Sequence, residues 1–216
     1  MCFSATASFV SAGIMGVSGL TALASVQRPR AIPLAAAPLI FAIQQSVEGM
    51  LWLRLPEGPD GSASVVLTYT FLVFAMVFWP LYGPVAIMAV EHDPLRRRFQ
   101  TVCLVAGTIA AIYLGWRLLT FSHIGLIEKN HIQYRADSSV PRVVFLLYLL
   151  ATGGAAIASS DWTVRLFGMV VFLGLAVSYL FYWEALTSVW CFFAAAGSFI
   201  ILAHFRIEKR HVERAC

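Results

Sequence analysis

Long apolar runs alternate with short polar segments along the whole chain. A helix needs about 20 apolar residues to cross the hydrocarbon core of a bilayer, and seven runs approach or exceed this length. The pattern predicts an all-α polytopic membrane protein, a bundle of seven transmembrane helices. The runs cover residues 3–26, 32–53, 65–90, 101–121, 143–158, 163–183 and 187–205.

Some local sequence features modify this picture. The third run contains FWPLYGP, and its prolines, Pro80 and Pro84, predict a kink or a local break in the helix. The first run has a small residue at every fourth position from Ser4 to Gly16, which predicts close packing against a neighbouring helix. The segment at 122–142 is more polar and is expected to be a loop.

The composition supports membrane insertion. Hydrophobic residues make up 60% of the chain and charged residues only 12%, whereas soluble domains carry roughly 25% charged residues. The basic residues are confined to short loops and the last residues of the chain, so nucleic-acid binding is not expected. Because Lys and Arg are absent from residues 1–27, the first run is expected to be a retained helix rather than a cleaved signal peptide.

The distribution of Lys and Arg predicts the orientation of the helices. With the N-terminus outside, ten of these residues fall in inner loops and the C-terminal tail, and three fall in outer loops. We therefore expect the N-terminus outside and the C-terminus in the cytoplasm. The chain then divides into a transmembrane domain, residues 1–205, and a basic cytoplasmic tail, residues 206–216. The lipid bilayer is its expected partner.

This topology places most of the residues that could bind a ligand or take part in catalysis in the outer half of the bundle. They come from several different segments, so a shared location rather than a motif connects them. The group consists of Cys2, Glu48, Arg117, His123, His131, Glu184 and Cys191.

Glu48 is the foremost candidate for a functional residue. It lies in the apolar stretch IQQSVEGMLW, where Gln44 and Gln45 share its helix face, and an ionisable group inside a membrane indicates a functional site by default. Glu48 is therefore a candidate catalytic or metal-binding residue, and the two glutamines are candidate ligand-binding residues. The alternative is a structural ion pair between Glu48 and Arg117, and the two interpretations are compatible.

Cys2 is the second candidate. Removal of the initiator methionine would leave an amine and a thiol on adjacent carbon atoms, a pair that can chelate a metal or act as a nucleophile. Two other interpretations stay open: Cys2 as a small apolar residue, or Cys2 in a disulfide bond with Cys191.

The two histidines in the 122–142 segment extend the set of possible metal ligands. His123 and His131 are eight residues apart, so they could share an ion only through the fold of the loop. Together with Cys2 and Glu48 they provide the donors of a zinc or copper site. Trp52 lies one turn from Glu48. It is a candidate ligand-binding residue in the wall of a pocket, or alternatively an anchor at the membrane interface.

Three stretches carry a family resemblance. MCFSATASF, PLIFAIQQSVEGMLW and SVWCFFAA resemble a family of uncharacterised bacterial integral membrane proteins, whose members begin Met-Cys-Phe-Ser and carry Gln-Gln-x-x-Glu-Gly in the second helix. The resemblance implies seven helices and a bacterial inner-membrane location, and it implies no mechanism.

These observations favour an outward-facing polar site for a metal ion or a small ligand. Two other functions stay open at this level. A transporter or channel would use the broken third run and the intramembrane polar stripe, and a sensor or assembly partner would use the basic tail. Whether the protein is an enzyme does not follow from its sequence.

Overall fold

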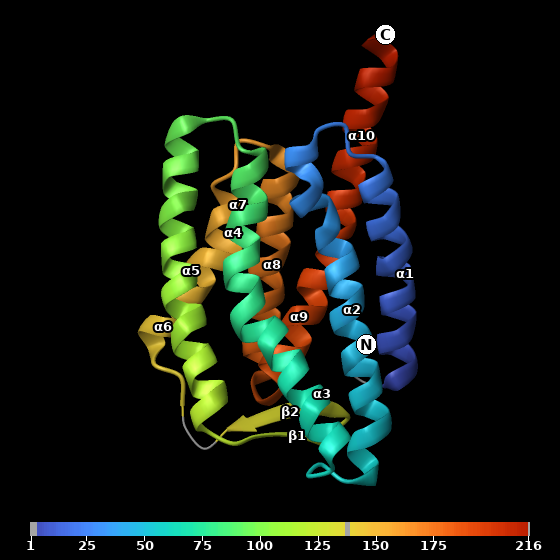
Figure 1. Cartoon of the computed structure of the whole chain (residues 1–216), viewed down its shortest axis with the longest axis vertical. Coiled ribbons are helices and arrows are strands. Elements are labelled where there is room, and N and C mark those ends of the chain that lie inside the picture. Colours follow the sequence, from blue (N-terminus) through green and yellow to red (C-terminus); the bar gives the residue numbers. More distant parts are fainter. Residues whose placement is uncertain (1–3, 137–138, 216) are drawn as a thin grey trace.

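The helices of the computed structural model stand side by side in one bundle (Figure 1), and the structure describes residues 4–136 and 139–215. The described residues form seven helical stretches, and an antiparallel hairpin of β1 (His123–Glu128) and β2 (His131–Ala136) joins the fourth stretch to the fifth. The seven stretches are α1 (Ala5–Ala24); α2 (Ile32–Arg54); α3 (Ser62–Leu72) with η3 (Val73–Phe78) and α4 (Trp79–Val90); α5 (Pro94–Thr120); α6 (Arg142–Leu149) with η4 (Leu150–Gly154) and α7 (Ala155–Ile157); α8 (Trp162–Phe181); and α9 (Leu186–Gly197) with α10 (Phe199–Ala215).

Six of these stretches are long and apolar enough to cross a membrane. The remaining one, Arg142–Ile157, is apolar but shorter. Short 3₁₀ turns, η1 (Pro29–Ala31), η2 (Leu55–Glu57) and η5 (Trp183–Ala185), lie at the ends of the longer helices. Each apolar run in the sequence thus corresponds to a helical stretch, which confirms the helical architecture.

Two helix boundaries differ from the expected ones. Helix α5 begins at Pro94 rather than near residue 101, because the Asp93 side chain accepts hydrogen bonds from the backbone N–H groups of Leu95 and Arg96 and so caps the helix. At the other end of the chain, α10 continues through Ala215, so the expected tail is helical. Helices carry polar turns beyond the apolar core, and apolar runs alone do not reveal them.

The expected loop at 122–142 contains the β-hairpin. Its strands alternate in burial, and the connecting residues Lys129 and Asn130 both have positive φ angles, 49° and 61°. Two consecutive residues of this kind form the tight turn that suits the twist of a two-stranded hairpin. The prediction of a polar loop missed these strands, because the alternation in HIGLIE and HIQYRA is short and partly polar.

The irregularity expected near Pro80 is present as a π-helical segment, η3, which ends at Phe78, two residues before the proline. A second π-helical turn, η4, interrupts the short stretch that contains Gly153 and Gly154. The hydroxyl of Tyr148 donates a hydrogen bond to the carbonyl oxygen of Ala75 in η3. A backbone carbonyl that a wider turn would leave without a partner is thereby satisfied across the bundle.

The small residues of α1 face α2, as expected. Ser8 and Ala12 are buried, and a Cβ atom on Gly16 would lie 3.9 Å from the Cβ atom of Ala42. At Gly19 the approach is closer still, since a Cβ atom would lie 2.5 Å from the backbone nitrogen of Leu39. The two helices therefore pack backbone against backbone along this ridge.

Replacing Gly107 by alanine is expected to destabilise the bundle by about 1–3 kcal/mol, the usual cost of overpacking. A Cβ atom there would lie 2.0 Å from the carbonyl oxygen of Pro80, so α4 and α5 would have to separate. Gly83 is the matched control, because a Cβ atom there meets nothing within 4 Å and alanine favours a helix. Thermal unfolding in detergent should show a lower midpoint for Gly107→Ala and an equal or higher one for Gly83→Ala; equal midpoints would contradict the close approach.

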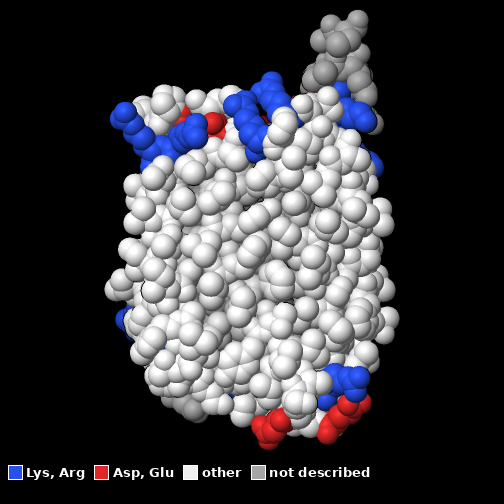
Figure 2. Space-filling view, viewed as in Figure 1, with Lys and Arg blue, Asp and Glu red and all other residues white. Residues whose placement is uncertain are grey.

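Most charged side chains gather at the two ends of the bundle, and a broad band with very few charges separates them (Figure 2). The end that holds the α1–α2 and α4–α5 connections is rich in Lys and Arg in this view. The opposite end holds the hairpin and the α2–α3 connection. We call these the basic end and the hairpin end.

Candidate functional site

The polar stripe of α2 lies in the interior of the bundle. Gln44, Gln45 and Glu48 all have side chains with no exposed surface. Their spacing of three and four residues places them on one helix face, and α2 packs against α1, α4, α9 and α10. The stripe is therefore enclosed by protein rather than turned toward lipid.

Helix α9 completes this group, which we call the Glu48 cluster: Gln44, Gln45, Glu48, Ser188 and Cys191. The hydroxyl of Ser188 donates a hydrogen bond to Oε1 of Glu48. Cys191, three residues further along α9, is a buried free thiol beside Gln44 and Glu48. The structure thus brings Cys191 to Glu48, as expected from their shared location, and it does not pair Cys191 in a disulfide bond.

Several polar atoms of the Glu48 cluster lack hydrogen-bond partners among the described residues. They are Nε2 of Gln44, Nε2 and Oε1 of Gln45, and Oε2 of Glu48. Buried polar groups in folded proteins are nearly always satisfied, because each unsatisfied one costs about 1–3 kcal/mol. Because both donors and acceptors of the cluster lack hydrogen-bond partners, the cluster can bind a ligand that offers both kinds of group.

The expected ion pair between Glu48 and Arg117 is not among the ion pairs of residues 4–136 and 139–215. Arg117 is buried on α5, and its guanidinium carbon lies 5.6 Å from the centre of the Phe121 ring. The carboxylate of Glu48 and the guanidinium of Arg117 therefore occupy separate places in the bundle, and the structural explanation for Glu48 loses its proposed partner.

A small aromatic cavity adjoins the Glu48 cluster. Its volume is about 60 Å³, and its walls include Phe41, Trp79, Tyr82, Tyr148, Trp190 and Cys191. Trp79 connects the two features, since its indole N–H donates a 2.6 Å hydrogen bond to Oε1 of Gln44 and its ring stacks on Phe41. Trp52 does not line this cavity and is half-buried against a neighbouring apolar cluster that includes Leu51 and Cys191.

The two loop histidines lie at opposite ends of the hairpin. In its register His123 pairs with Ala136 and His131 pairs with Glu128, five residues further along, so about 17 Å separates them at the rise of a β-strand. Nδ1 of His123 lies 2.8 Å from the carbonyl oxygen of Phe121, and Nδ1 of His131 lies 2.6 Å from that of Lys129. The two histidines cannot ligate the same ion in this arrangement.

A metal site is not visible in the described part of the chain. No group of three or more His, Cys, Asp and Glu side chains converges there. Cys2, the remaining expected ligand, lies outside the described residues. Zinc or copper binding therefore stays a prediction that rests on Cys2.

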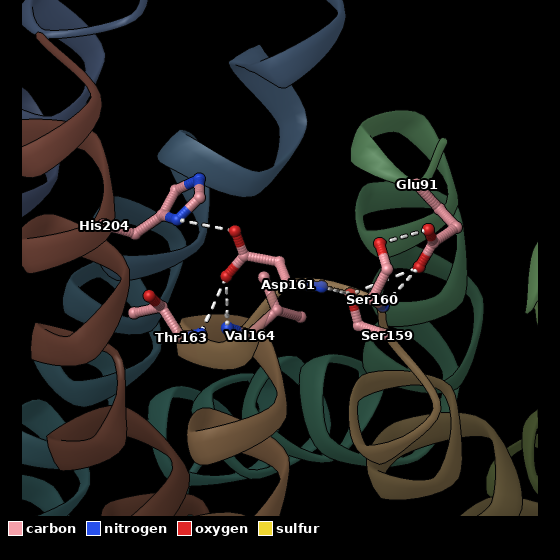
Figure 3. A network of polar contacts seen from close by, with 7 residues as sticks. All are labelled: Glu91, Ser159, Ser160, Asp161, Thr163, Val164 and His204. Carbon is pink, nitrogen blue, oxygen red and sulfur yellow. Dashed lines mark hydrogen bonds and ion pairs between the residues drawn. The ribbon is translucent and has the colours of Figure 1, made fainter. Parts of the chain in front are cut away.

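A second buried carboxylate, Glu91, lies at the basic end (Figure 3). Six donors approach its two oxygens at 2.5–3.3 Å. They are the backbone N–H groups of His92, Asp93 and Ser160, the hydroxyls of Ser159 and Ser160, and the amide of Gln100. Burial raises the pKa of Glu91, but these hydrogen bonds outweigh it and lower the pKa to about 2. Glu91 thus joins the α4–α5 connection to the α7–α8 connection.

Asp161 extends this network toward α10 (Figure 3). One oxygen caps α8 by accepting from the backbone N–H groups of Thr163 and Val164, and the other lies 3.4 Å from Nδ1 of His204. The hydrogen bond from His204 lowers the pKa of Asp161 to about 2, against the opposing effect of burial. Glu91 and Asp161 differ from Glu48 in that their oxygens are well supplied with donors.

The model of a family of unknown function, DUF6629, matches residues 1–215 of the chain. The chain belongs to DUF6629. Neither curated proteins nor solved structures gave a match. Membership extends over nearly the whole chain, so the bundle, the Glu48 cluster and the Glu91 network all lie within the DUF6629 region.

The sequence reasoning missed three residues of this DUF6629 chain, Ser188, Glu91 and Asp161. Two of them carried a usable signal. EHDP and SSDW both place an aspartate, Asp93 or Asp161, directly before the first residue of a helix, which is the usual sign of an N-cap. Glu91 lies two residues before the first of these aspartates. Ser188 gave no such signal, since a serine in an apolar helix usually bonds to its own backbone.

Proposed function

We propose that this protein crosses the bacterial inner membrane seven times, N-terminus outside and C-terminus in the cytoplasm, and binds a small cation at the Glu48 cluster. Ten Lys and Arg residues at the inner side of the helices and in the tail, against three in the outer loops and Arg54 at the outer end of α2, support the orientation. A seventh crossing by the shorter Arg142–Ile157 stretch is supported by Arg96, whose guanidinium donates to the carbonyl oxygens of Ala158 and Ser159. The chain that leaves α5 at the hairpin end has therefore returned to the basic end by residue 158.

One observation carries the binding proposal, the unpartnered Oε2 of Glu48 in a fully buried side chain. A buried carboxylate is stable only when it is protonated or balanced by a cation. The ion pairs of the described residues include none with Glu48, so a cation from solution is a candidate counter-charge. Oε1 of Gln45, three residues away on the same face, offers a second acceptor.

The cation can be a metal ion or a small ammonium compound. The acceptors described are oxygens, which suit hard cations and ammonium groups. The aromatic walls of the neighbouring cavity suit the apolar part of an ammonium compound, because cations are attracted to the faces of aromatic rings. A transition metal would need the additional donors of Cys2.

Thermal unfolding of the purified protein in a neutral detergent tests this proposal. The probes are sodium, potassium, ammonium, methylammonium and zinc ions as chloride salts, at equal ionic strength. A bound cation at a hundred times its dissociation constant stabilises the folded state by about 2.7 kcal/mol, which raises the midpoint by a few degrees. We expect at least one probe to give this rise in the wild type and none in Glu48→Gln.

Glu57→Gln is the matched control, because Glu57 is exposed at the end of the same helical stretch. It should keep the rise produced by the active probe. An equal rise in Glu48→Gln, or no rise with any of the five probes, would contradict cation binding at Glu48.

A further inference from the structure

A pocket opens at the basic end of the bundle, away from the Glu48 cluster. Its volume is about 440 Å³, and four separate parts of the chain form it: the α1–α2 connection, the end of α4, the start of α8, and α10. Figure 2 shows Lys and Arg side chains grouped at this end of the molecule. The pocket therefore lies where a ligand would meet several positive charges.

Two guanidinium groups converge in this pocket. Nη1 of Arg28 lies 3.4 Å from Nε2 of His92, and a guanidinium nitrogen of Arg30 contacts the same ring nitrogen. Arg28 and Arg30 take part in none of the ion pairs formed within residues 4–136 and 139–215. Two like charges held side by side without a carboxylate partner attract an anion.

The acidic residues of the pocket do not neutralise this pair. Asp161 already accepts hydrogen bonds from the start of α8 and is paired with His204. Glu208 of α10 also lines the pocket and offsets one positive charge. With His204 protonated, the Asp161–His204 pair is neutral, and one guanidinium charge is left to attract an anion.

The position and walls of the pocket indicate which anion. Ala31, Val90 and Ile207 give it an apolar side at the level where the helices emerge from the apolar band. Basic pockets between transmembrane helices bind the head groups of anionic phospholipids. The planar guanidinium group of arginine matches the geometry of a phosphate group, and each guanidinium can donate two hydrogen bonds to the phosphate oxygens.

We propose that this pocket binds a phosphate group through the guanidinium groups of Arg28 and Arg30. The phosphate belongs either to an anionic phospholipid head group or to free phosphate. The site is separate from the Glu48 cluster and adds a second ligand to the one proposed there.

Two binding measurements with a double variant test this inference. The first follows thermal unfolding in neutral detergent with inorganic phosphate, using chloride at equal ionic strength as the reference. The second compares nanodiscs of phosphatidylcholine alone with nanodiscs that also contain phosphatidylglycerol. Arg28→Gln/Arg30→Gln should weaken binding about tenfold or more, because the variant loses both charged donors to the phosphate oxygens.

Arg97→Gln/Arg98→Gln is the control. It removes the same amount of charge from the basic end, but Arg97 and Arg98 are exposed and do not line the pocket. Its affinity should stay within about twofold of the wild type, as expected for charges outside the site. Glu208→Gln gives an independent check, because loss of its negative charge should strengthen binding.

The outcomes separate the sources of the phosphate. A response to both probes that the double variant loses supports a site for free phosphate. A response confined to phosphatidylglycerol, and lost in the double variant, supports a lipid head group. Equal loss in both double variants would show only general attraction by the basic end and would overturn the proposal, as would the absence of any response in the wild type.

Discussion

Replacing Glu91 by alanine is expected to destabilise the protein by about 3 kcal/mol at neutral pH. The pKa of Glu91 is lowered from 4.5 to about 2, and each pKa unit corresponds to about 1.4 kcal/mol of interaction with the charged form. The substitution also leaves six donors without their acceptor in a place that is only 4% exposed. Thermal or denaturant unfolding in detergent measures the loss.

The same residue should make stability depend on pH in the acid range. Its pKa is lower in the folded state, so its contribution is fully present above pH 4.5 and is lost as the pH falls toward 2. Asp161 adds to the loss over a similar range. In Glu91→Gln the dependence should be weaker, because only Asp161 then contributes it within this network.

Glu57→Ala is the control for this prediction. Its carboxylate is largely exposed and paired with Arg54 on the surface, and such pairs contribute about 0–1 kcal/mol. A Glu91→Ala variant that unfolds with the same midpoint as Glu57→Ala would contradict the view that Glu91 joins the two connections.

Replacing Glu48 by methionine is expected to have the opposite effect and to stabilise the protein, in the absence of ligand, by about 1–4 kcal/mol. Glu48 is as buried as Glu91, but one of its oxygens has no partner among the described residues. Methionine fills a similar volume without that cost. A substitution that raises the stability of the folded protein but abolishes ligand binding is the usual sign that the replaced residue is functional.

Ser188→Ala is the matched variant. It removes the hydroxyl that donates to Oε1 and leaves the charge buried, so it should lower stability by about 1–3 kcal/mol. Unfolding midpoints of the two variants should therefore lie on opposite sides of the wild type. A Glu48→Met variant less stable than the wild type would mean that Glu48 holds the bundle together, whatever the outcome of the cation experiments.

The sequence was informative where one helix carries the whole pattern. Gln44, Gln45 and Glu48 are visible as a polar stripe because an α-helix fixes their relative positions. The partners of that stripe, Ser188 and Trp79, come from other helices, and their contacts depend on how the helices are rotated and paired. Single-sequence patterns do not contain that information.

The location of the histidines shows the same limit. Both were placed correctly in the connection between the fourth and fifth helical stretches, yet their separation depends on the strand register and the turn at Lys129 and Asn130. Helix boundaries were missed for another reason. The residues of 94–100 and 206–215 form helix beyond the apolar core, where hydropathy no longer marks the structure.

The unequal fastening of the two ends of the bundle has a consequence for ligand entry. At the basic end, Glu91 and Arg96 tie successive connections together with many hydrogen bonds. At the hairpin end, the ion pair of Lys129 with Glu184 joins the hairpin to the α8–α9 connection, but both side chains are exposed, and such pairs contribute only about 0–1 kcal/mol. We therefore expect the helices to pivot about the basic end and to part at the hairpin end, so that a ligand reaches Glu48 through a gate on the hairpin side.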